Sequence, residues 1–407
     1  MPILTRAEAC SLFVGACATA FLPRAAMAAP LELGCDRFIA SAWTELRGKP
    51  LGLVTNQTGL LSSGESLIDA LARNPAIRLR ALFSPEHGLR GTQSAGLTVR
   101  DGRDPATGLP VFSLYGKTRR PTPAMLAGID ALLFDIQDVG ARTYTYISTL
   151  AMVMQTAAAL GKSVWVLDRP NPIGGRLVEG PVLEPAFSSF IGLYPLPMRH
   201  GMTMGEIARL YRDAFGIACD LQIIPMRNYA RSMLWSDTGL RWVPTSPNIP
   251  HFSTALTYLS TGPLGSAGIN SGVGSPAPFA LALAPGLDGN ALAAALNARA
   301  LEGIRFSPAS WTPQRGYWRG RELTGVQLHV TEPHRFYSVR AALEILAAVR
   351  GIDPQTLRYS SGWDKVWGSD SVRIMLQRGV APEAMLAHWQ PRLAAFIAER
   401  EQVLLYG

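Results

Sequence analysis

Leu51-Gly52-Leu53-Val54-Thr55 is the first of four apolar runs that decide the fold of this 407-residue chain. The other three runs span residues 79–83, 131–136 and 164–167. Each run is apolar almost throughout, as expected of parallel strands that are covered on both faces. Stretches with helical periodicity lie between or after them, at residues 65–73, 148–160 and 203–215. This alternation predicts an α/β fold with a Rossmann-like parallel sheet.

The second half of the chain has a different composition. Residues 229–285 are rich in Pro, Gly, Ser and Asn, which predicts an ordered loop that crosses a cleft. Beyond it, the pattern predicts a helix, two strands and three helices at residues 287–299, 304–306, 326–330, 338–349, 371–378 and 391–404. We therefore expect three parts: a signal peptide at 1–28, a Rossmann-like catalytic domain at 29–260, and a smaller α+β C-terminal domain at 261–407 that completes the cleft.

The N-terminus has the features of an export signal. Arg6 precedes an apolar run over residues 10–22, and Ala26-Met27-Ala28 is a small-x-small cleavage site. A buried N-terminal helix is the alternative, which Pro23 directly after the run disfavours. We expect an exported protein, periplasmic or secreted. No later run approaches the roughly 18 apolar residues of a membrane-spanning helix, so no membrane span is expected.

Charge and cysteine content narrow the function classes. The net charge is +8, but the cationic residues are scattered, which is typical of a solvated surface, with a polyanion-binding face as the alternative. Such a charge suits anionic wall polymers, and we expect no nucleic-acid partner. Cleavage of the signal would leave Cys35 and Cys219, either as a disulfide or, as we favour, as two small buried side chains.

Polar residues follow each of the four predicted strands. Because the carboxyl ends of parallel strands share one edge of the sheet, these side chains should gather there. They are Asn56 and Gln57 after the first strand, Glu86 and His87 after the second, Asp135, Asp138, Arg142 and Tyr144 after the third, and Asp168 and Asn171 after the fourth. Any one of them can instead cap a helix or a turn, but the whole set favours a common site.

Paired carboxylates at such an edge favour glycoside hydrolysis. That reaction needs one protonated carboxyl group to release the leaving oxygen and one carboxylate to assist attack. Glu86 is the better candidate for the acid, because Pro85 and Gly88 hold it in a tight turn behind an apolar strand. Asp138 is the candidate partner, with Asp135 in reserve, and His87 orients Glu86 or binds substrate.

Further residues are candidates for substrate binding. Arg142 and the pair Arg199-His200 offer forked donors for an anionic substituent, with surface ion pairs as the alternative. Asn248 lies in the Pro-rich segment Ser246-Pro247-Asn248-Ile249-Pro250 and can bond sugar hydroxyls. Nearby aromatic residues can stack on a sugar ring or pack in the core; they are Trp242, Phe252 and Tyr258.

Other chemistries lack their motifs. The sequence has no Gly-x-Ser-x-Gly, no Ser-x-x-Lys and no His-Glu-x-x-His, which disfavours esterases, β-lactamase-like enzymes and zinc proteases. No Gly-x-Gly-x-x-Gly follows the first strand, so the sheet does not imply a dinucleotide. The six His residues do not cluster at ligand spacing. We expect neither a cofactor nor a metal.

Long motifs in this chain resemble the exo-lytic β-N-acetylmuramidase family, in order over roughly residues 35–400. They lie at residues 52–59, 84–91, 135–146, 168–175, 199–203 and 246–250. The resemblance implies a Rossmann-like domain with a smaller C-terminal domain, and removal of terminal N-acetylmuramic acid from the non-reducing ends of peptidoglycan fragments. It also implies that Glu86 is the proposed catalytic glutamate, and that His87, Asp138, Arg142, Tyr144 and Asn248 lie in the cleft.

One stretch departs from the family pattern. Residues 267–275 keep the glycines and Asn270, here a candidate substrate contact, but lose a carboxylate and a guanidinium. This departure predicts a changed preference for the sugar or its substituent. Two alternatives therefore stay open beside the muramidase hypothesis: a non-catalytic protein that binds muropeptides or glycans, and an exported hydrolase of another bond.

Overall fold

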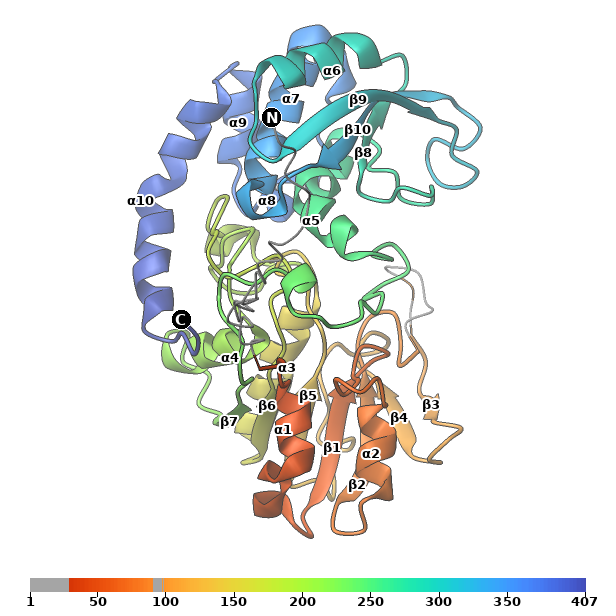
Figure 1. Ribbon diagram of the computed structural model, residues 1–407, viewed down its shortest axis with the longest axis vertical. Coiled ribbons are helices and arrows are strands. Elements are labelled where there is room, and N and C mark those ends of the chain that lie inside the picture. Colours follow the sequence, from red (N-terminus) through yellow and green to blue (C-terminus); the bar gives the residue numbers. More distant parts are fainter. Residues whose placement is uncertain (1–28, 91–96, 98) are drawn as a thin grey trace, which may run out of the picture.

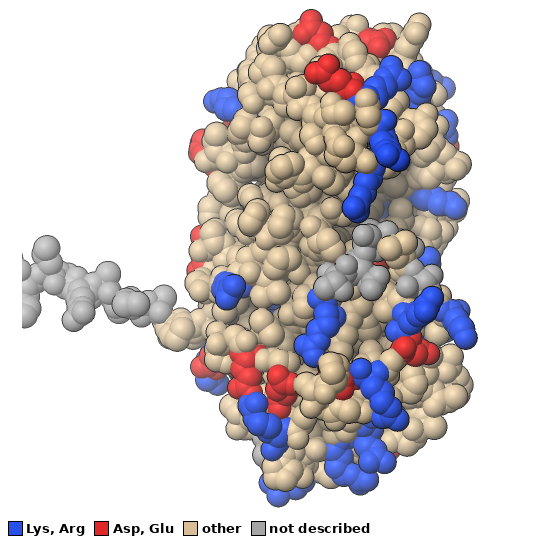
Figure 2. Space-filling model, turned by 90° about the vertical axis from the view of Figure 1, so that its right-hand side faces the viewer, with Lys and Arg blue, Asp and Glu red and all other residues tan. Residues whose placement is uncertain are grey.

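The structure is a computed structural model that describes residues 29–90, 97 and 99–407. Figure 1 shows two lobes: a lower lobe built on a seven-stranded sheet and an upper lobe built on a three-stranded sheet. Figure 2 shows one face of the molecule, on which Lys and Arg side chains are spread from the upper to the lower end. No helix among the described residues is both long and apolar enough to cross a membrane.

The seven-stranded sheet confirms the predicted fold class. Its strands follow the order β3-β4-β2-β1-β5-β6-β7, and all neighbours are parallel except β3 and β4. Their bounds are β1 Pro50–Thr55, β2 Arg78–Ser84, β3 Gly102–Arg103, β4 Pro110–Ser113, β5 Ala131–Asp135, β6 Ser163–Leu167 and β7 Asp220–Ile224. The parallel strands therefore have the doubly wound Rossmann order, which changes direction between β1 and β5.

Alternating side chains of the strands supply two cores. In β5, Leu133 packs in one core with α1 (Gly34–Ala40) and α2 (Leu67–Arg73). Leu132 and Phe134 pack in the other with α3 (Tyr146–Ala159) and α4 (Met204–Asp213). All five residues of β5 are buried, which explains why its run reads apolar throughout. Helix α4 begins with a capping box, in which Thr203 Oγ1 accepts from Glu206 N and Glu206 Oε2 accepts from Thr203 N.

The upper lobe is an antiparallel sheet covered by helices. Its strands β8 (Leu281–Ala284), β9 (Ile304–Trp311) and β10 (Leu323–Val330) follow the order β8-β10-β9. The helices of this half are α5 Phe252–Thr261, α6 Gly289–Ala298, α7 Ser338–Ile352, α8 Trp363–Trp367, α9 Ser371–Gln377 and α10 Pro382–Glu401. Helix α10 runs down the side of the molecule to the lower lobe (Figure 1), where Arg400 Nη1 donates to the carbonyl of Gly175.

Two sequence predictions were wrong in detail. The segment 229–285 was expected to be a loop, but it contains α5 and β8. Helix α5 is buried on nearly all sides, but five of its ten residues are Ser or Thr, which have low helix propensity, so its sequence reads as a loop. Helix α10 begins at Pro382 and continues through Pro391, the residue expected to start it. Proline is favoured in a first turn, but packing of residues such as Trp389 and Leu393 holds the helix through the second proline.

The two cysteines form no disulfide. Cys35 lies in α1, Cys219 directly precedes β7, and both thiols are free and buried. Burial raises the pKa of Cys219 to about 11, so the thiol stays protonated at neutral pH. The expectation of two small buried side chains is therefore confirmed. The domain limits predicted at residues 28 and 260 stay predictions.

Candidate functional site

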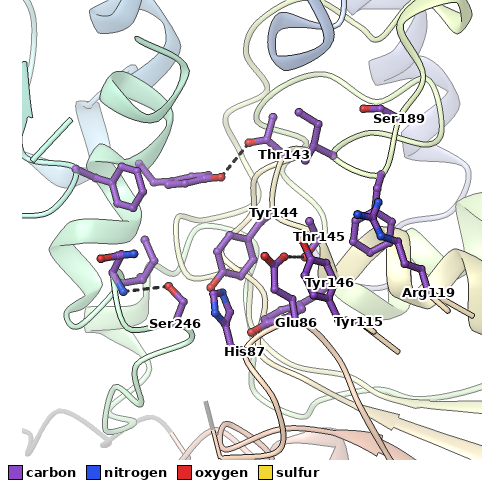
Figure 3. A pocket seen from close by; sticks show the side chains of 16 residues that line it. Glu86, His87, Tyr115, Arg119, Thr143, Tyr144, Thr145, Tyr146, Ser189 and Ser246 are labelled. Atoms are coloured by element: carbon purple, nitrogen blue, oxygen red, sulfur yellow. Dashed lines mark hydrogen bonds between the residues drawn. The ribbon is translucent and has the colours of Figure 1, made fainter. Parts of the chain in front are cut away.

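A cavity of about 400 Å³ lies at the carboxyl end of the sheet, under α5 (Figure 3). It is lined by side chains from the turn after β2, from the loop after β4, from the start of α3, and from a segment at residues 240–250 that we call the strap. The lining residues are Glu86, His87, Tyr115, Arg119, Thr143–Tyr146, Ser189–Ile191, Ser246, Asn248, Ile249, Tyr258 and Phe279.

A tight turn presents Glu86 to this cavity. Gly88 N donates to the carbonyl of Pro85 at 3.1 Å, directly after β2 ends at Ser84. Both His87 and Gly88 have positive φ, 72° and 78°. This region is easy for glycine but unusual for histidine, so His87 stores backbone strain. Glu86 and His87 are both buried.

Hydroxyl groups from two other elements hold Glu86. Thr145 Oγ1, at the N-terminus of α3, donates to Glu86 Oε2 at 2.6 Å, as Figure 3 shows. Tyr115 follows β4, and its pKa is raised by burial, by the negative charge of Glu86 and by a hydrogen bond with Glu86. The carboxyl group is thus fixed at the wall of the cavity, as a positioned proton donor requires.

Arg119 supplies a cation to the same cavity. It is exposed, and its guanidinium lies over the rings of Phe190 and Tyr115, with Cζ at 4.3 Å and 5.3 Å from their centroids. The stacking holds the guanidinium plane while leaving its edge available for a carboxylate.

The strap forms the wall opposite Glu86. Gln57 Nε2 donates to the carbonyls of Pro244 and Thr245 at 2.8 and 3.2 Å, and Tyr146 OH donates to the carbonyl of Thr245 at 2.7 Å. Tyr144 OH donates to Thr245 Oγ1 at 2.8 Å. These bonds fix the strap, which presents half-buried Asn248 to the cavity.

The structure brings five of the residues named from the sequence to this cavity: Glu86, His87, Tyr144, Asn248 and Tyr258. Two more stand directly behind them. Gln57 anchors the strap, and Asn56 Nδ2 donates to Tyr146 OH at 3.0 Å. These two residues therefore do not line the cavity but hold in place residues that form its wall.

The predicted arginines lie elsewhere. Arg142 is fully buried and donates to the carbonyls of Pro181, Leu196 and Val366 at 2.8 to 3.0 Å. Burial lowers its pKa to about 9. Arg199 is paired with buried Glu179, Nη1 to Oε2 at 2.9 Å. Neither guanidinium lines the cavity, because both are used to join backbone segments.

His200 and Asp138 form a buried pair behind the cavity. His200 Nε2 lies 3.9 Å from Asp138 Oδ2, which accepts from Gly140 N at 2.7 Å. Burial raises the pKa of Asp138 to about 7, while burial and two nearby arginines, Arg400 and Arg199, lower the pKa of His200 to about 3. Within the described part of the chain, Asp138 Oδ1 has no hydrogen-bond partner.

The other predicted residues have local structural contacts. Arg169 forms a forked pair with buried Asp135, at 2.6 and 2.9 Å. Asn171 Nδ2 donates to the carbonyl of Met202 at 3.0 Å. Asn270 Oδ1 accepts from Gly272 N at 2.7 Å, in the upper lobe, so the altered stretch 267–275 contributes no lining residue to the Glu86 cavity.

Sequence reasoning missed much of the lining. The missed residues are Tyr115, Arg119, Thr143, Thr145, Tyr146, Ser189–Ile191, Ser246, Ile249 and Phe279. Tyr115 and Arg119 follow β4, which is only four residues long and begins with Pro110. Recognising Pro110–Ser113 as a strand would have drawn attention to them. Residues 189–191 follow no strand and carry no comparable signal.

No group of three or more His, Cys, Asp and Glu side chains across residues 29–90, 97 and 99–407 is arranged to hold a metal ion. The chemistry available at the cavity is therefore that of Glu86, the hydroxyl groups around it, the imidazole of His87 and the guanidinium of Arg119.

Comparison with known proteins adds to this geometry. The family model "Exo-beta-N-acetylmuramidase NamZ, N-terminal" matches residues 51–253, and the corresponding C-terminal model matches residues 256–406. The peptidoglycan beta-N-acetylmuramidase NamZ of Bacillus subtilis (strain 168) is 41% identical over 378 residues, which cover 92% of this chain and 91% of that protein.

Two crystal structures of DUF1343 family proteins from Bacteroides fragilis NCTC 9343 are also similar. They have TM-scores of 0.86 and 0.74 and sequence identities of 35% and 25%, and each match covers 93% of this chain and 99% of the other. Sequence and fold thus agree over nearly the whole chain, which belongs to the exo-beta-N-acetylmuramidase NamZ family.

Proposed function

We propose that this protein is a glycosidase that removes terminal N-acetylmuramic acid from the non-reducing end of peptidoglycan fragments. The observation that carries the proposal is buried Glu86, held by Thr145 at the wall of a cavity of about 400 Å³. That volume is near the lower end of small-molecule pockets, which suits one terminal sugar. The relative from Bacillus subtilis is named for β-N-acetylmuramidase activity on peptidoglycan.

Glu86 is the general acid in this proposal. Its proton passes to the glycosidic oxygen as the bond from that oxygen to C1 of the muramic acid breaks. Thr145 and Tyr115 keep the carboxyl group in place. His87 is the next residue on the same turn, and its imidazole also lines the cavity.

Glu86 is the one carboxylate among the described residues that line the cavity. We therefore propose that the substrate supplies the second group, with its acetamido oxygen bonding to C1 as the leaving oxygen departs. Water then adds to C1 as the bond from C1 to the acetamido oxygen breaks, and it gives a proton back to Glu86. The two displacements at C1 together retain configuration. Asp138, the partner expected from the sequence, lies behind the cavity wall, and its role as a catalytic base stays a prediction.

Arg119 takes the role that the sequence had suggested for Arg142 and Arg199. The lactyl carboxylate distinguishes muramic acid from glucosamine, and a guanidinium binds carboxylates through paired donors. Arg119 is the only Lys or Arg side chain among the described residues that line the cavity. Asn248 and the phenol of Tyr258 are placed to bind hydroxyls of the same sugar.

We also propose that the protein is exported, to the periplasm or outside the cell. The support is the charged, apolar and small-residue pattern of residues 1–28, which lies outside the described residues. N-terminal sequencing of the protein from extracytoplasmic fractions tests this. A mature N-terminus at Ala29 is expected, and an intact Met1 in the cytoplasm contradicts it.

The central test compares hydrolysis of a chromogenic N-acetylmuramide with that of the matching N-acetylglucosaminide. We expect cleavage of the muramide with retention of configuration, release of free N-acetylmuramic acid from wall fragments, and a large rate loss with an N-trifluoroacetyl muramide, whose acetamido oxygen is a poor nucleophile. If neither sugar is cleaved while wall fragments still bind, the protein is a non-catalytic binder and the proposal fails.

A further inference from the structure

Phe279 lines the Glu86 cavity from the upper lobe, just before β8 begins. Its side chain is half-buried, so part of the ring is open to the cavity. The proposed reaction assigns no role to this residue. Its backbone conformation and its contacts both indicate that the position of the ring is fixed for binding.

The backbone of Phe279 has a positive φ of 58°. Bulky side chains rarely adopt this region, because it brings Cβ close to the following carbonyl oxygen. Among the described residues, four that are not glycine have positive φ: His87, Asn228, Phe279 and Ala300. Two of these four, His87 and Phe279, line the same cavity. Strained residues of this kind cluster at ligand sites, where the surrounding structure holds them in place.

Three contacts hold Phe279 in this conformation. Its N donates to the carbonyl of Ser271 at 2.7 Å, and its carbonyl accepts from Thr261 Oγ1, at the end of α5, also at 2.7 Å. Its ring meets the ring of Tyr258 edge to face, with centroids 4.9 Å apart. Ser271 belongs to the stretch 267–275, which therefore contacts the cavity through Phe279 although it contributes no lining residue. A ring that is fixed before a ligand arrives lowers the entropic cost of binding.

Phe279 differs from the other aromatic rings that line the cavity. Tyr115 and Phe190 lie under the guanidinium of Arg119. The other three lining tyrosines take part in hydrogen bonds through their hydroxyl groups; they are Tyr144, Tyr146 and Tyr258. A pyranose ring carries polar groups at its rim and C–H groups on its face, and the face matches the broad apolar surface of an aromatic ring. The groups already assigned bind the rim of the sugar, and Phe279 matches its face.

We propose that Phe279 is a further substrate-binding residue, whose ring packs on the C–H face of the terminal amino sugar. The inference rests on the proposed function for the class of ligand. It divides recognition between two residues. Phe279 binds the pyranose ring that N-acetylmuramic acid shares with N-acetylglucosamine, and Arg119 binds the lactyl carboxylate that N-acetylglucosamine lacks. Loss of the Phe279 ring should therefore weaken the binding of both sugars equally.

A local probe shows whether a sugar contacts this ring. The full chain is labelled with 4-fluorophenylalanine, and the ¹⁹F resonances of Phe279 and Phe190 are assigned with Phe279→Leu and Phe190→Leu. Phe190 also lines the cavity and reports its occupancy in the Phe279 variants. Phe38, buried in α1 of the lower lobe, is the internal control resonance. Free N-acetylmuramic acid and N-acetylglucosamine are then titrated separately.

We expect both sugars to shift the Phe279 resonance. Phe279→Leu keeps an apolar side chain but loses the ring, so it should raise the concentration of either sugar needed to shift Phe190 by roughly tenfold. Phe279→Tyr keeps the ring and should restore most of the affinity. Glycine adopts positive φ without strain, so Phe279→Gly should fold even if Phe279→Leu does not, and it should lose affinity by a similar factor.

The inference is overturned if Phe190 responds to a sugar while Phe279 does not, or if neither responds to millimolar sugar. It is also overturned if Phe279→Leu binds both sugars as the wild type does. A loss confined to N-acetylmuramic acid has the same consequence, because it places the effect at the lactyl group. The titration does not depend on turnover. Muramide hydrolysis without a Phe279 response contradicts this inference alone, and a Phe279 response without hydrolysis contradicts the proposed reaction while leaving sugar binding intact.

Discussion

Glu86 follows β2 and Asp138 follows β5, and the two carboxyl groups meet different surroundings. Glu86 lines the cavity and accepts a hydrogen bond from Thr145. Asp138 lies behind the wall, where Gly140 N satisfies one oxygen and burial raises its pKa to about 7. The neighbours of a carboxyl group at a strand end thus decide whether it lines the cavity or is bonded within the surrounding structure. We call residues of the second kind framework residues.

The arginines show the same contrast. Arg119 lies exposed over two aromatic rings at the cavity. Arg142 is buried and bonds three carbonyls, one of which, from Val366, belongs to the upper lobe. A Cβ on Gly368, at φ +74°, would come within 2.8 Å of the Arg142 guanidinium, so the local backbone is shaped around this residue. Cavity residues should therefore affect activity, and framework residues stability.

The largest effect on activity is expected for Glu86→Gln. Loss of the general acid should lower kcat on the N-acetylmuramide by roughly a hundredfold or more, while the thermal unfolding midpoint changes little. Steady-state kinetics and calorimetry on the same preparation measure both. Glu302→Gln, which changes an exposed glutamate of the upper lobe, is the control. A variant that keeps most of its kcat would remove Glu86 from the mechanism.

Arg142→Met tests the framework side of the comparison. The variant keeps the apolar volume but removes the Arg142 donors from the carbonyls of Pro181 and Val366, and one of two donors from that of Leu196. We therefore expect a loss of about 3 kcal/mol in the free energy of unfolding. Denaturant unfolding measures it, with exposed Arg120→Met as the matched control. If stability is unchanged while KM for the muramide rises, Arg142 contacts substrate after all.

The sheet was predictable because burial on both faces leaves a strong signal in sequence. Leu132 and Phe134 face one core and Leu133 the other, so β5 reads apolar up to Asp135. The short strand β4, with Pro110 at its start, carries no such signal and was missed. Helix α5 was missed because five of its ten residues are Ser or Thr, which have low helix propensity, and because prolines precede it.

The candidate site was predictable only in part. Strand-end reasoning placed Glu86, His87 and Tyr144 in one region, the Pro-rich segment indicated Asn248, and all four line the cavity. Strand-end reasoning did not separate the first three from Arg142, because the same residue types at the same edge also form buried bonds between segments. Which of these residues face the cavity depends on the positions of the strap and of α5. Tertiary packing sets those positions, so the local sequence does not reveal them.

Asp138→Asn should change how stability depends on pH. The folded-state pKa of about 7 lies above the ordinary value of 3.8, so the protonated form is favoured by folding. Stability from this group is present below about pH 4 and is lost as pH rises through 7. Asn cannot ionise, so the variant should gain on the wild type over this range, by on the order of 2 kcal/mol at pH 7.

Unfolding free energies at several pH values between 4 and 8 check this difference, with Asp130→Asn, at an exposed position, as the control. If the free energies of unfolding of the variant and the wild type depend on pH in the same way, Asp138 is not held protonated in the folded protein. Kinetics on the same variant bear on the catalytic prediction for Asp138: a fall in kcat as large as that of Glu86→Gln would place Asp138 in the mechanism.

The smallest expected effect separates the two arginine classes. Arg119→Gln should raise KM for the muramide by roughly tenfold, because a charge-assisted bond to the lactyl carboxylate is lost. It should leave kcat, and hydrolysis of any uncharged glucosaminide, nearly unchanged. Arg120→Gln is a close control, since it removes the same charge one residue along the chain at a side chain that does not line the cavity. Equal effects of the two variants would mean that long-range charge attracts the substrate and that Arg119 makes no specific contact with it.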